Sequence, residues 1–503
     1  MKFLFRRSVF FSTLILVQLS VLVLAIFTMA GSFLYVYSAL VVLSLTVVAW
    51  LINSNENPST TLGWTILALS LPLVGGLFYF LFGRAKVSSR LKKKSDSVVP
   101  IYKELLPDDK DILDEITDDH IKNQIQYLKK CTFPVYRNID LKYLPSGEEK
   151  FAEMCKCLNA AKKYIFLEYF IISSGKMWDS ILKILIKKAK EGLDIRLIYD
   201  DCGCLGLLPI NYADELSRHG IKCRVFNPFV PSLTVTMNNR DHRKILVIDG
   251  EIAFTGGINL SDEYINVKKR YGHWKDCAIV FKGDAVITML SLFLEGWNLI
   301  SRQKEDIRAL LPEKATEEKE HDGYIQPFGD SPFDNDIVGE NVYLNMINKA
   351  KREILIMTPY LIIDHTLTSS LCLAAKNGIT VKILTPGIAD KWYVHNMTQS
   401  SYPHLIKSGV EIIEYTPGFM HSKVVCCDGE IATVGTVNFD YRSLYLHFEC
   451  GAVIYKSKII SKIRDDFYSS AEKSKVITLE DCKSIKWYKK LFSSIFKVFA
   501  PLM

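Results

Sequence analysis

Residues 238–259 read NNRDHRKILVIDGEIAFTGGIN and place His242, Lys244 and Asp249 in a His-x-Lys-x4-Asp pattern. Residues 418–438 read GFMHSKVVCCDGEIATVGTVN and repeat the pattern with His421, Lys423 and Asp428. In both copies a glycine follows the aspartate by seven positions and an asparagine by ten, which gives Gly256, Asn259, Gly435 and Asn438. One such pattern can arise by chance, but two copies with matched downstream spacing indicate an internal duplication.

The residue types of each copy suit chemistry on a phosphate. The run KILVID predicts a buried strand, and DGE predicts a tight turn into the next strand. Because residues two apart on a strand point to the same face, the histidine and the lysine project together. An ammonium and an asparagine amide bind phosphate oxygens, and a histidine serves as nucleophile or as general acid–base near neutral pH. Two facing copies would flank one phosphodiester, with one histidine attacking and the other protonating the leaving alcohol.

The paired motifs resemble those of the phospholipase D superfamily, whose mark is two HKD motifs, and within it the bacterial cardiolipin synthases. The resemblance runs from about residue 33 to the C-terminus. It implies a phosphohistidine mechanism without a metal or another cofactor, in which the six motif residues are catalytic and Asn259 and Asn438 bind phosphate. By the same analogy His242 is the nucleophile and His421 the general acid, an order that the residues themselves leave open.

The family resemblance also implies an acidic residue against each catalytic histidine. Asp276 in GHWKDCAIV and Glu449 in HFECGAV stand at the matching places after the two motifs, where a carboxylate fixes the imidazole tautomer. His447 stands where the family often has asparagine, and we interpret it as structural. Residues at positions that line the family's substrate groove are Glu168, Tyr169, Tyr360 and Ser443.

The N-terminal 94 residues predict a membrane anchor. Three apolar stretches, Val9–Met29, Ser32–Ile52 and Gly63–Phe82, precede a basic run that extends from Arg84 to Lys94. The first two have the length of a membrane-spanning helix. The positive-inside rule puts both the Arg-containing N-terminus and the basic run in the cytosol, which requires an even number of spans. The alternatives are two spans with one re-entrant or interfacial segment, or an N-terminus outside.

The remaining chain predicts an α/β fold with two similar lobes. Residues 95–130 are a charged, helix-like linker, and in lobe 1 (131–305) strands at 164–172, 194–199 and 222–226 alternate with helices at 177–192 and 212–219. Lobe 2 (336–482) repeats the order with strands at 353–360, 380–384 and 410–415 and helices at 341–351, 367–377 and 392–408. Such alternation favours mostly parallel sheets. Residues 306–335 are charged and contain proline and glycine, as expected of a linker between two lobes that form one pseudo-twofold unit.

The amino-acid composition indicates the cellular compartment of the catalytic lobes. The 503 residues are 49% hydrophobic with a net charge of +7, and the 12 cysteines are mostly scattered in apolar strand patterns without zinc-like spacing. Free thiols of this kind favour catalytic lobes that face the cytosol. Residues 483–503 mix lysines with Trp, Leu, Phe and Ile at helical spacing, which we interpret as an amphipathic helix on the membrane; the alternative is a helix docked on the catalytic body.

These expectations combine into a multi-pass enzyme of the cell membrane that transfers phosphatidyl groups. The family resemblance implies phosphatidylglycerol as the substrate, with cardiolipin and glycerol as products and other anionic phospholipids as partners. A hydrolytic phospholipase D would share every catalytic residue. A nuclease is disfavoured because the basic residues cluster beside the predicted membrane region, so no nucleic-acid partner is expected. A lipid-binding scaffold would have no need of two complete motifs.

Overall fold

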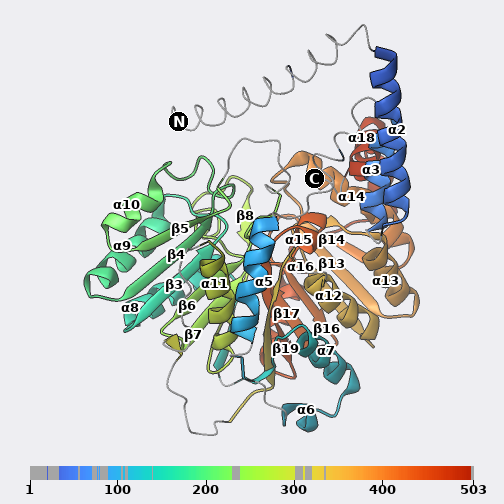
Figure 1. The fold of residues 1–503 in the computed structure, drawn as a ribbon. Helices are drawn as coiled ribbons and strands as arrows, with labels where there is room; N and C mark the ends of the chain where they lie inside the picture. The colour runs from blue at the N-terminus through green and yellow to red at the C-terminus, as the bar shows by residue number, and fades with distance from the viewer. Residues whose placement is uncertain are drawn as a thin grey trace.

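The computed structural model describes residues 33–54, 57–70, 89–103, 111–138, 140–228, 238–300, 320–333 and 336–499, together with positions 20, 76, 79, 106–107 and 310–311. Two lobes lie side by side, each built on a twisted sheet, with helices α5 (Ser89–Lys103) and α11 (Val286–Ile300) between them in Figure 1. The first predicted apolar stretch lies outside the described residues except for Ser20, as does most of the third beyond Ser70.

Lobe 1 contains a seven-stranded sheet of order β2-β9-β7-β6-β3-β4-β5. Only β3 (Tyr164–Tyr169), β4 (Asp194–Asp200) and β5 (Lys222–Phe226) pair in parallel. The other strands pair antiparallel: β6 (Lys244–Ile248), β7 (Ile252–Gly256), β9 (Ala278–Lys282) and β2 (Asp140–Leu144). The prediction of a mostly parallel sheet is therefore wrong. The tight turn after Asp249 connects β6 directly to β7, and strands joined by a short turn must run antiparallel.

Lobe 2 repeats this order in a nine-stranded sheet, β1-β10-β19-β17-β16-β11-β13-β14-β20. The parallel strands are β11 (Glu353–Met357), β13 (Thr380–Pro386) and β14 (Glu411–Tyr415). The motif hairpin is β16 (Val424–Cys427) with β17 (Ile431–Gly435), followed outward by β19 (Glu449–Tyr455) and β10 (Tyr324–Asp330). The edge strands β1 (Tyr136–Arg137) and β20 (Lys475–Val476) have no counterpart in lobe 1. The matching order confirms the duplication.

The helices begin and end where local chemistry dictates. Ser146, Asp118 and Asp364 accept hydrogen bonds from backbone N–H groups at the first turns of α8 (Gly147–Ala160), α7 (Asp119–Lys130) and α13 (His365–Lys376). The chain leaves α9 (Lys176–Lys190), α13 and α14 (Trp392–Lys407) through glycines with φ of +93°, +86° and +101°, a backbone region that favours glycine: Gly192, Gly378 and Gly409. The other lobe helices are α10 (Tyr212–Arg218), α12 (Val338–Lys349), α15 (Tyr441–Tyr445), α16 (Ile459–Ala471) and α17 (Leu479–Ser484).

The core has three parts. An inner cluster joins the facing sides of both sheets with α11 and α16 and includes Phe293, Trp297 and Ile463. The two outer clusters lie between each sheet and its own outer helices. The inner cluster buries apolar side chains of both lobes against each other, so the hydrophobic effect holds the lobes as one body.

The described parts of both segments predicted as linkers belong to the folded body. Strand β10, within residues 306–335, pairs with β19 over seven residues. Helices α6 (Ile112–Glu115) and α7, within residues 95–130, bury Ile112, Ile125 and Leu128 in the outer core of lobe 2. Pro327 lies on β10 beyond Tyr324 and Ile325, the two residues that pair with β1, so at the proline β10 is paired only with β19. A strand that is unpaired on one side tolerates proline.

The terminal helices pack together at one end of the molecule (Figure 1). Helix α2 (Phe33–Ile52) falls on the second predicted apolar stretch and packs against α3 (Pro58–Ser70). Among the described helices, none combines the length and apolarity needed to cross a bilayer. Helix α18 (Trp487–Phe499) packs against α14 and α3, with the Phe492 ring 5.0 Å from that of Trp392. The C-terminal helix is therefore docked on the catalytic body, which was the alternative interpretation of its sequence.

Candidate active site

The two motif histidines lie where the two sheets meet, and backbone hydrogen bonds across the lobes fix them there. The His242 N–H donates to the Phe448 carbonyl at 2.9 Å, and the His421 N–H donates to the Lys275 carbonyl at 2.7 Å. Strands β8 (His273–Lys275) and β15 (Gly418–Met420) pair in parallel across the same boundary. Each motif histidine is thus attached to the residue that precedes an acidic residue of the opposite lobe.

Those acidic residues are Glu449 and Asp276, and each contacts the histidine of the other lobe. Nδ1 of His242 lies 2.9 and 3.0 Å from the two carboxylate oxygens of Glu449. Nδ1 of His421 lies 2.6 Å from Oδ2 of Asp276. With Nδ1 occupied by a carboxylate, Nε2 of each imidazole is left for a substrate, and the carboxylate stabilises the charged imidazolium when it forms.

Lys244 and Lys423 lie beside the histidines as the strand alternation predicts. Lys244 Nζ donates to the His242 carbonyl at 2.5 Å, and Lys423 Nζ lies 2.9 Å from Nδ1 of His421. Both lysines are buried, which lowers the pKa of Lys244 to about 7 and that of Lys423 to about 8. Near neutral pH both lysines are therefore partly protonated, and their positive charge attracts an anion to the buried site. Binding of the anion in turn raises the pKa of both lysines.

Burial controls the protonation of the histidines and their carboxylates. It lowers the pKa of His242 and of His421 well below the ordinary value, and the neighbouring lysines lower both further. It raises the pKa of Asp276 to about 6 and that of Glu449 to about 8. Burial therefore favours neutral imidazoles, the state in which a nitrogen lone pair can attack phosphorus.

Asp249 and Asp428, predicted as catalytic, lie apart from the histidines. Each carboxylate accepts three backbone N–H bonds of 2.7–3.0 Å from the start of its lobe's first parallel strand, at Lys162, Lys163, Tyr164 and at Lys351, Arg352, Glu353. Both aspartates have positive φ, 56° and 58°, at the turn into the second motif strand. Seven residues of strand put Asp249 roughly 20 Å from His242. Both carboxylates therefore support strand pairing and turn geometry, and a catalytic role for them stays a prediction.

The asparagines that were predicted to bind phosphate differ in their contacts. Asn259 Oδ1 accepts from the Ile171 N–H at 3.0 Å, and its Nδ2 donates to the Tyr264 hydroxyl at 2.7 Å. The Tyr264 ring lies 5.4 Å from the ring of His421. Asn438 is buried, and its Oδ1 makes no hydrogen bond with any described residue. The amide donor of Asn259 thus holds an aromatic side chain against the second histidine.

The residues predicted to line a groove divide into two kinds. Glu168 and Tyr169 are wholly buried, as are Lys244 and Glu449. The Glu168 carboxylate pairs with Arg243 at 2.5 Å, and the Tyr169 ring lies under Lys150 Nζ at 4.8 Å. Tyr169 pairs with Lys244 at the end of β3, and a role of these two residues in a substrate groove stays a prediction.

Tyr360 and Ser443 lie closer to the chemistry. The Tyr360 hydroxyl donates to Asp390 at 2.7 Å, and this aspartate is one of the charges that act on His421. Ser443 Oγ donates to Oε1 of Glu449 at 2.5 Å, and the Thr436 hydroxyl donates to the other oxygen. Ser443 therefore positions the carboxylate that holds His242 and does not line an open groove.

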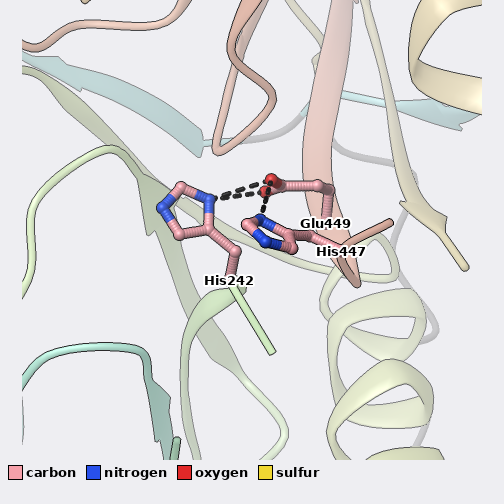
Figure 2. Close-up of side chains that lie close together, drawn as sticks. All are labelled: His242, His447 and Glu449. Atoms are coloured by element: carbon pink, nitrogen blue, oxygen red, sulfur yellow. Dashed lines mark hydrogen bonds and ion pairs between the residues drawn. The ribbon is translucent and has the colours of Figure 1, made fainter. Parts of the chain in front are cut away.

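His447 is the site residue that the sequence interpretation missed. Figure 2 shows His242, His447 and Glu449 turned toward one another. The His447 ring lies 5.7 Å from that of His242, and its Nδ1 is 3.9 Å from Glu449 Oε1. Both ring nitrogens are buried and have no hydrogen-bond partner among the described residues. The signal was present in the sequence, because His447 stands two residues before Glu449, the carboxylate that was predicted to hold a motif histidine.

These three side chains offer donor atoms that all lie within 4.8 Å of one another. Two imidazoles and a carboxylate are a donor set that Zn²⁺ uses. Both oxygens of Glu449, however, already accept hydrogen bonds from Ser443, Thr436 and His242. The carboxylate is therefore already engaged in orienting His242.

Comparisons with known proteins agree with this geometry. The family model described as "Cardiolipin synthase, PLD-like domain" matches residues 154–280 and 343–470, and the model "Phospholipase_D-nuclease N-terminal" matches residues 42–84. The chain is 40% identical to an uncharacterized protein of Streptococcus mutans over 91% of this chain and 99% of that one. It is 32% identical to a cardiolipin synthase of Halalkalibacterium halodurans over 89% and 90% of the two chains.

A solved structure shares the fold. The phosphatidylserine synthase of Haemophilus influenzae superimposes with a TM-score of 0.57 at 14% identity, covering 76% of this chain and 98% of that one. The fold of this chain is therefore known from a crystal structure of a protein with only 14% sequence identity.

Proposed function

Because the chain belongs to the phospholipase D-like family of cardiolipin synthases, we propose that it is a membrane-bound phosphatidyltransferase that makes cardiolipin and glycerol from two molecules of phosphatidylglycerol. The main support for the proposal is that each lobe supplies the carboxylate that contacts the histidine of the other lobe. Each histidine is oriented by an acidic residue of the opposite lobe, Glu449 for His242 and Asp276 for His421. In this arrangement the carboxylates occupy both Nδ1 atoms and leave both Nε2 atoms for a substrate.

In the first step Nε2 of His242 attacks the phosphorus of phosphatidylglycerol. The P–O bond to the headgroup glycerol breaks, and the leaving oxygen takes a proton from His421, whose pKa rises when the anionic phosphodiester binds beside it. The result is a phosphatidyl group covalently bound to His242. Glu449 stabilises the positive charge that this bond formation places on the imidazole.

In the second step a hydroxyl of another phosphatidylglycerol gives its proton to His421 and attacks the phosphorus. The P–N bond to His242 breaks, and the nitrogen lone pair returns to the imidazole. Lys244 and Lys423 stabilise the negative charge that develops on the phosphoryl oxygens. The second phosphatidylglycerol must reach the intermediate before water does, and water in its place would give the hydrolytic phospholipase D reaction.

The proposal includes a cell-membrane location for the chain, with the lobes on the cytosolic side. It is supported by the relationship to cardiolipin synthases and by the match of residues 42–84 to the N-terminal family model. All twelve cysteines lie within the described residues and are free thiols, as suits a reducing compartment.

The test is turnover of phosphatidylglycerol labelled in its headgroup glycerol by the purified full-length chain. We expect cardiolipin and free glycerol in equal amounts. Phosphatidic acid with glycerol would instead identify a hydrolase, and the absence of any product would reject the phosphatidyl chemistry. His242→Ala is the control for contaminating activity, since removal of the nucleophile should abolish both products. A lipid profile of cells that cannot convert phosphatidylglycerol, with and without this chain, tests the same reaction in a membrane.

A further inference from the structure

The edge of the molecule around the two histidines carries the exposed apolar side chains of the lobes. Tyr169 pairs with Lys244 where β3 ends and β6 begins, so His242 lies at the carboxyl edge of the parallel strands of lobe 1. Met357 pairs with Val424 in the same way and places His421 at the carboxyl edge in lobe 2. Loops 201–211 and 257–272 of lobe 1 and residues 387–392 of lobe 2 follow β4, β7 and β13 and open at these edges. We call these three loops the rim.

Among the described residues of 131–482, seven large apolar side chains are exposed. Five of the seven lie on the rim, with exposed fractions of 40–62%: Leu207, Ile210, Val267, Ile388 and Trp392. The other two, Leu373 and Val476, lie elsewhere on lobe 2. Single exposed apolar residues need no explanation, but their concentration on the loops that surround one site indicates a surface that meets an apolar partner.

The exposed charges of the rim indicate that its partner is anionic. Lys268, Lys269, Arg270 and Lys391 are exposed on the same loops as the apolar side chains. Apolar side chains interspersed with exposed lysine and arginine form surfaces that enter the headgroup region of an anionic bilayer, since the chains bury apolar area while the cations remain among the phosphates. The four acidic residues of the same loops are buried or half-buried, so the charges that the rim fully exposes are all positive: Asp201, Asp262, Glu263 and Asp390.

The rim is also continuous with the terminal helices. Trp392 begins α14, and its ring lies 5.0 Å from that of Phe492 on α18. Ser493 of α18 donates to the Asn396 carbonyl at 3.2 Å, and α18 packs in turn on α3. On its outer side α18 exposes Trp487, Tyr488 and Leu491. Figure 1 shows α14, α18, α3 and α2 at the same end of the molecule.

We infer that the rim is a membrane-docking surface, which inserts Leu207, Ile210, Val267, Ile388 and Trp392 into the cytosolic face of an anionic bilayer and so opens the site directly onto its lipids. The inference rests on the proposed function, because only an enzyme of membrane lipids needs its site at the bilayer surface. Docking of both lobes by the same edge would let the phosphate of a lipid reach the histidines while its acyl chains stay in the bilayer. Docking in this way would also let the donor lipid and the acceptor lipid enter the site from the same leaflet.

The test compares bilayer and water-soluble substrates for the full-length chain. The docking variant is Leu207→Ser, Ile210→Ser and Ile388→Ser together, and the matched control is Leu373→Ser with Val476→Ser, which removes equally exposed apolar side chains away from the rim. Activity is measured on phosphatidylglycerol in vesicles with the chain reconstituted, and on dibutyryl phosphatidylglycerol, which is soluble in water.

We expect the docking variant to lose about tenfold or more of its activity on vesicles and to keep that on the soluble lipid, while the control keeps both. Equal loss on both substrates, or no loss on vesicles, would overturn the inference. Failure of the wild-type chain on both substrates would reject the proposed function but leave docking testable without turnover. In that case quenching of tryptophan emission by brominated lipids in vesicles should decrease in Trp392→Phe, and unchanged quenching would overturn docking.

Discussion

His242 and Glu449 belong to opposite lobes, yet Nδ1 of the histidine lies 2.9 Å from the nearer carboxylate oxygen. The reciprocal pair, His421 and Asp276, lies at 2.6 Å across the same boundary. Each pair is fixed by a backbone bond, because the histidine N–H donates to the carbonyl of Phe448 or Lys275, the residue just before the carboxylate. Neither lobe therefore contains a complete site, and the chemistry exists only when the lobes are assembled.

Glu449→Gln should impair formation of the covalent intermediate. The amide cannot stabilise the charge that His242 acquires when it bonds to phosphorus, so we expect kcat to fall by about 10²-fold or more. Rapid-quench trapping of the phosphatidyl-histidine measures this step directly. Ser443→Ala, which removes one donor to the same carboxylate, should have a smaller effect in the same direction. A normal burst of intermediate in Glu449→Gln would contradict the assignment of His242 as nucleophile.

Asp276→Asn should impair the protonation of the leaving group. Without the carboxylate, His421 is a weaker partner for the proton, so turnover of phosphatidylglycerol should fall by about 10²-fold. A phosphatidyl ester of p-nitrophenol leaves without protonation, and its first turnover should remain near the wild-type rate. If the p-nitrophenyl ester rescues Glu449→Gln and not Asp276→Asn, the roles of the two histidines are reversed.

Asp249→Ala should destabilise the fold and spare the chemistry. The carboxylate accepts three backbone N–H bonds, from Lys162, Lys163 and Tyr164, and its loss should cost about 2–4 kcal/mol in the free energy of unfolding. Thermal denaturation of Asp249→Ala and Asp249→Asn measures the loss, which should be smaller for asparagine because it tolerates positive φ. The folded fraction should keep near-normal specific activity, whereas a loss of activity at unchanged stability would restore a catalytic role.

The rate should decline as pH rises through the range where the lysines lose charge. Burial lowers the pKa of Lys244 to about 7 and that of Lys423 to about 8, so kcat/KM should be highest below these values and fall above them. The pKa of His242 is well below its ordinary value of 6.5, so the nucleophile stays neutral and the acid limb appears only at lower pH. Lys423→Arg keeps its charge and should move the alkaline limb upward; an unchanged limb would show that Lys423 does not control it.

His447→Leu should raise stability while it lowers activity. Its two ring nitrogens are buried without partners among the described residues, and an unsatisfied buried polar atom costs about 1–3 kcal/mol. An apolar side chain of similar size removes that cost, so the melting temperature should increase. The ring also lies 5.7 Å from His242, so kcat should decrease several-fold, the usual trade between stability and activity at a functional site. A lower melting temperature would mean that the nitrogens have found partners, water included.

Much of this architecture could be predicted from the sequence. The duplicated motif, the strands and helices of both lobes, and the projection of His242 with Lys244 follow from strand alternation and local spacing. These features depend on neighbours within a few residues, which a sequence displays directly. The prediction of mostly parallel sheets was wrong because it also used only local information. The alternation of strands and helices does not show which strand the motif hairpin will join.

Long-range contacts were decided by the tertiary structure alone. Which carboxylate meets which histidine depends on how two lobes pack, and a linear spacing between Asp276, His421 and Glu449 carries no record of that packing. Asp249 accepts hydrogen bonds from Lys162, Lys163 and Tyr164, which lie 85–87 positions earlier in the chain. Strand β10 is buried in lobe 2 by partners more than a hundred residues away. The sequence by itself determined what groups the site contains; the packing of the two sheets determined which of them touch, because only burial between lobes brings distant residues within a hydrogen bond.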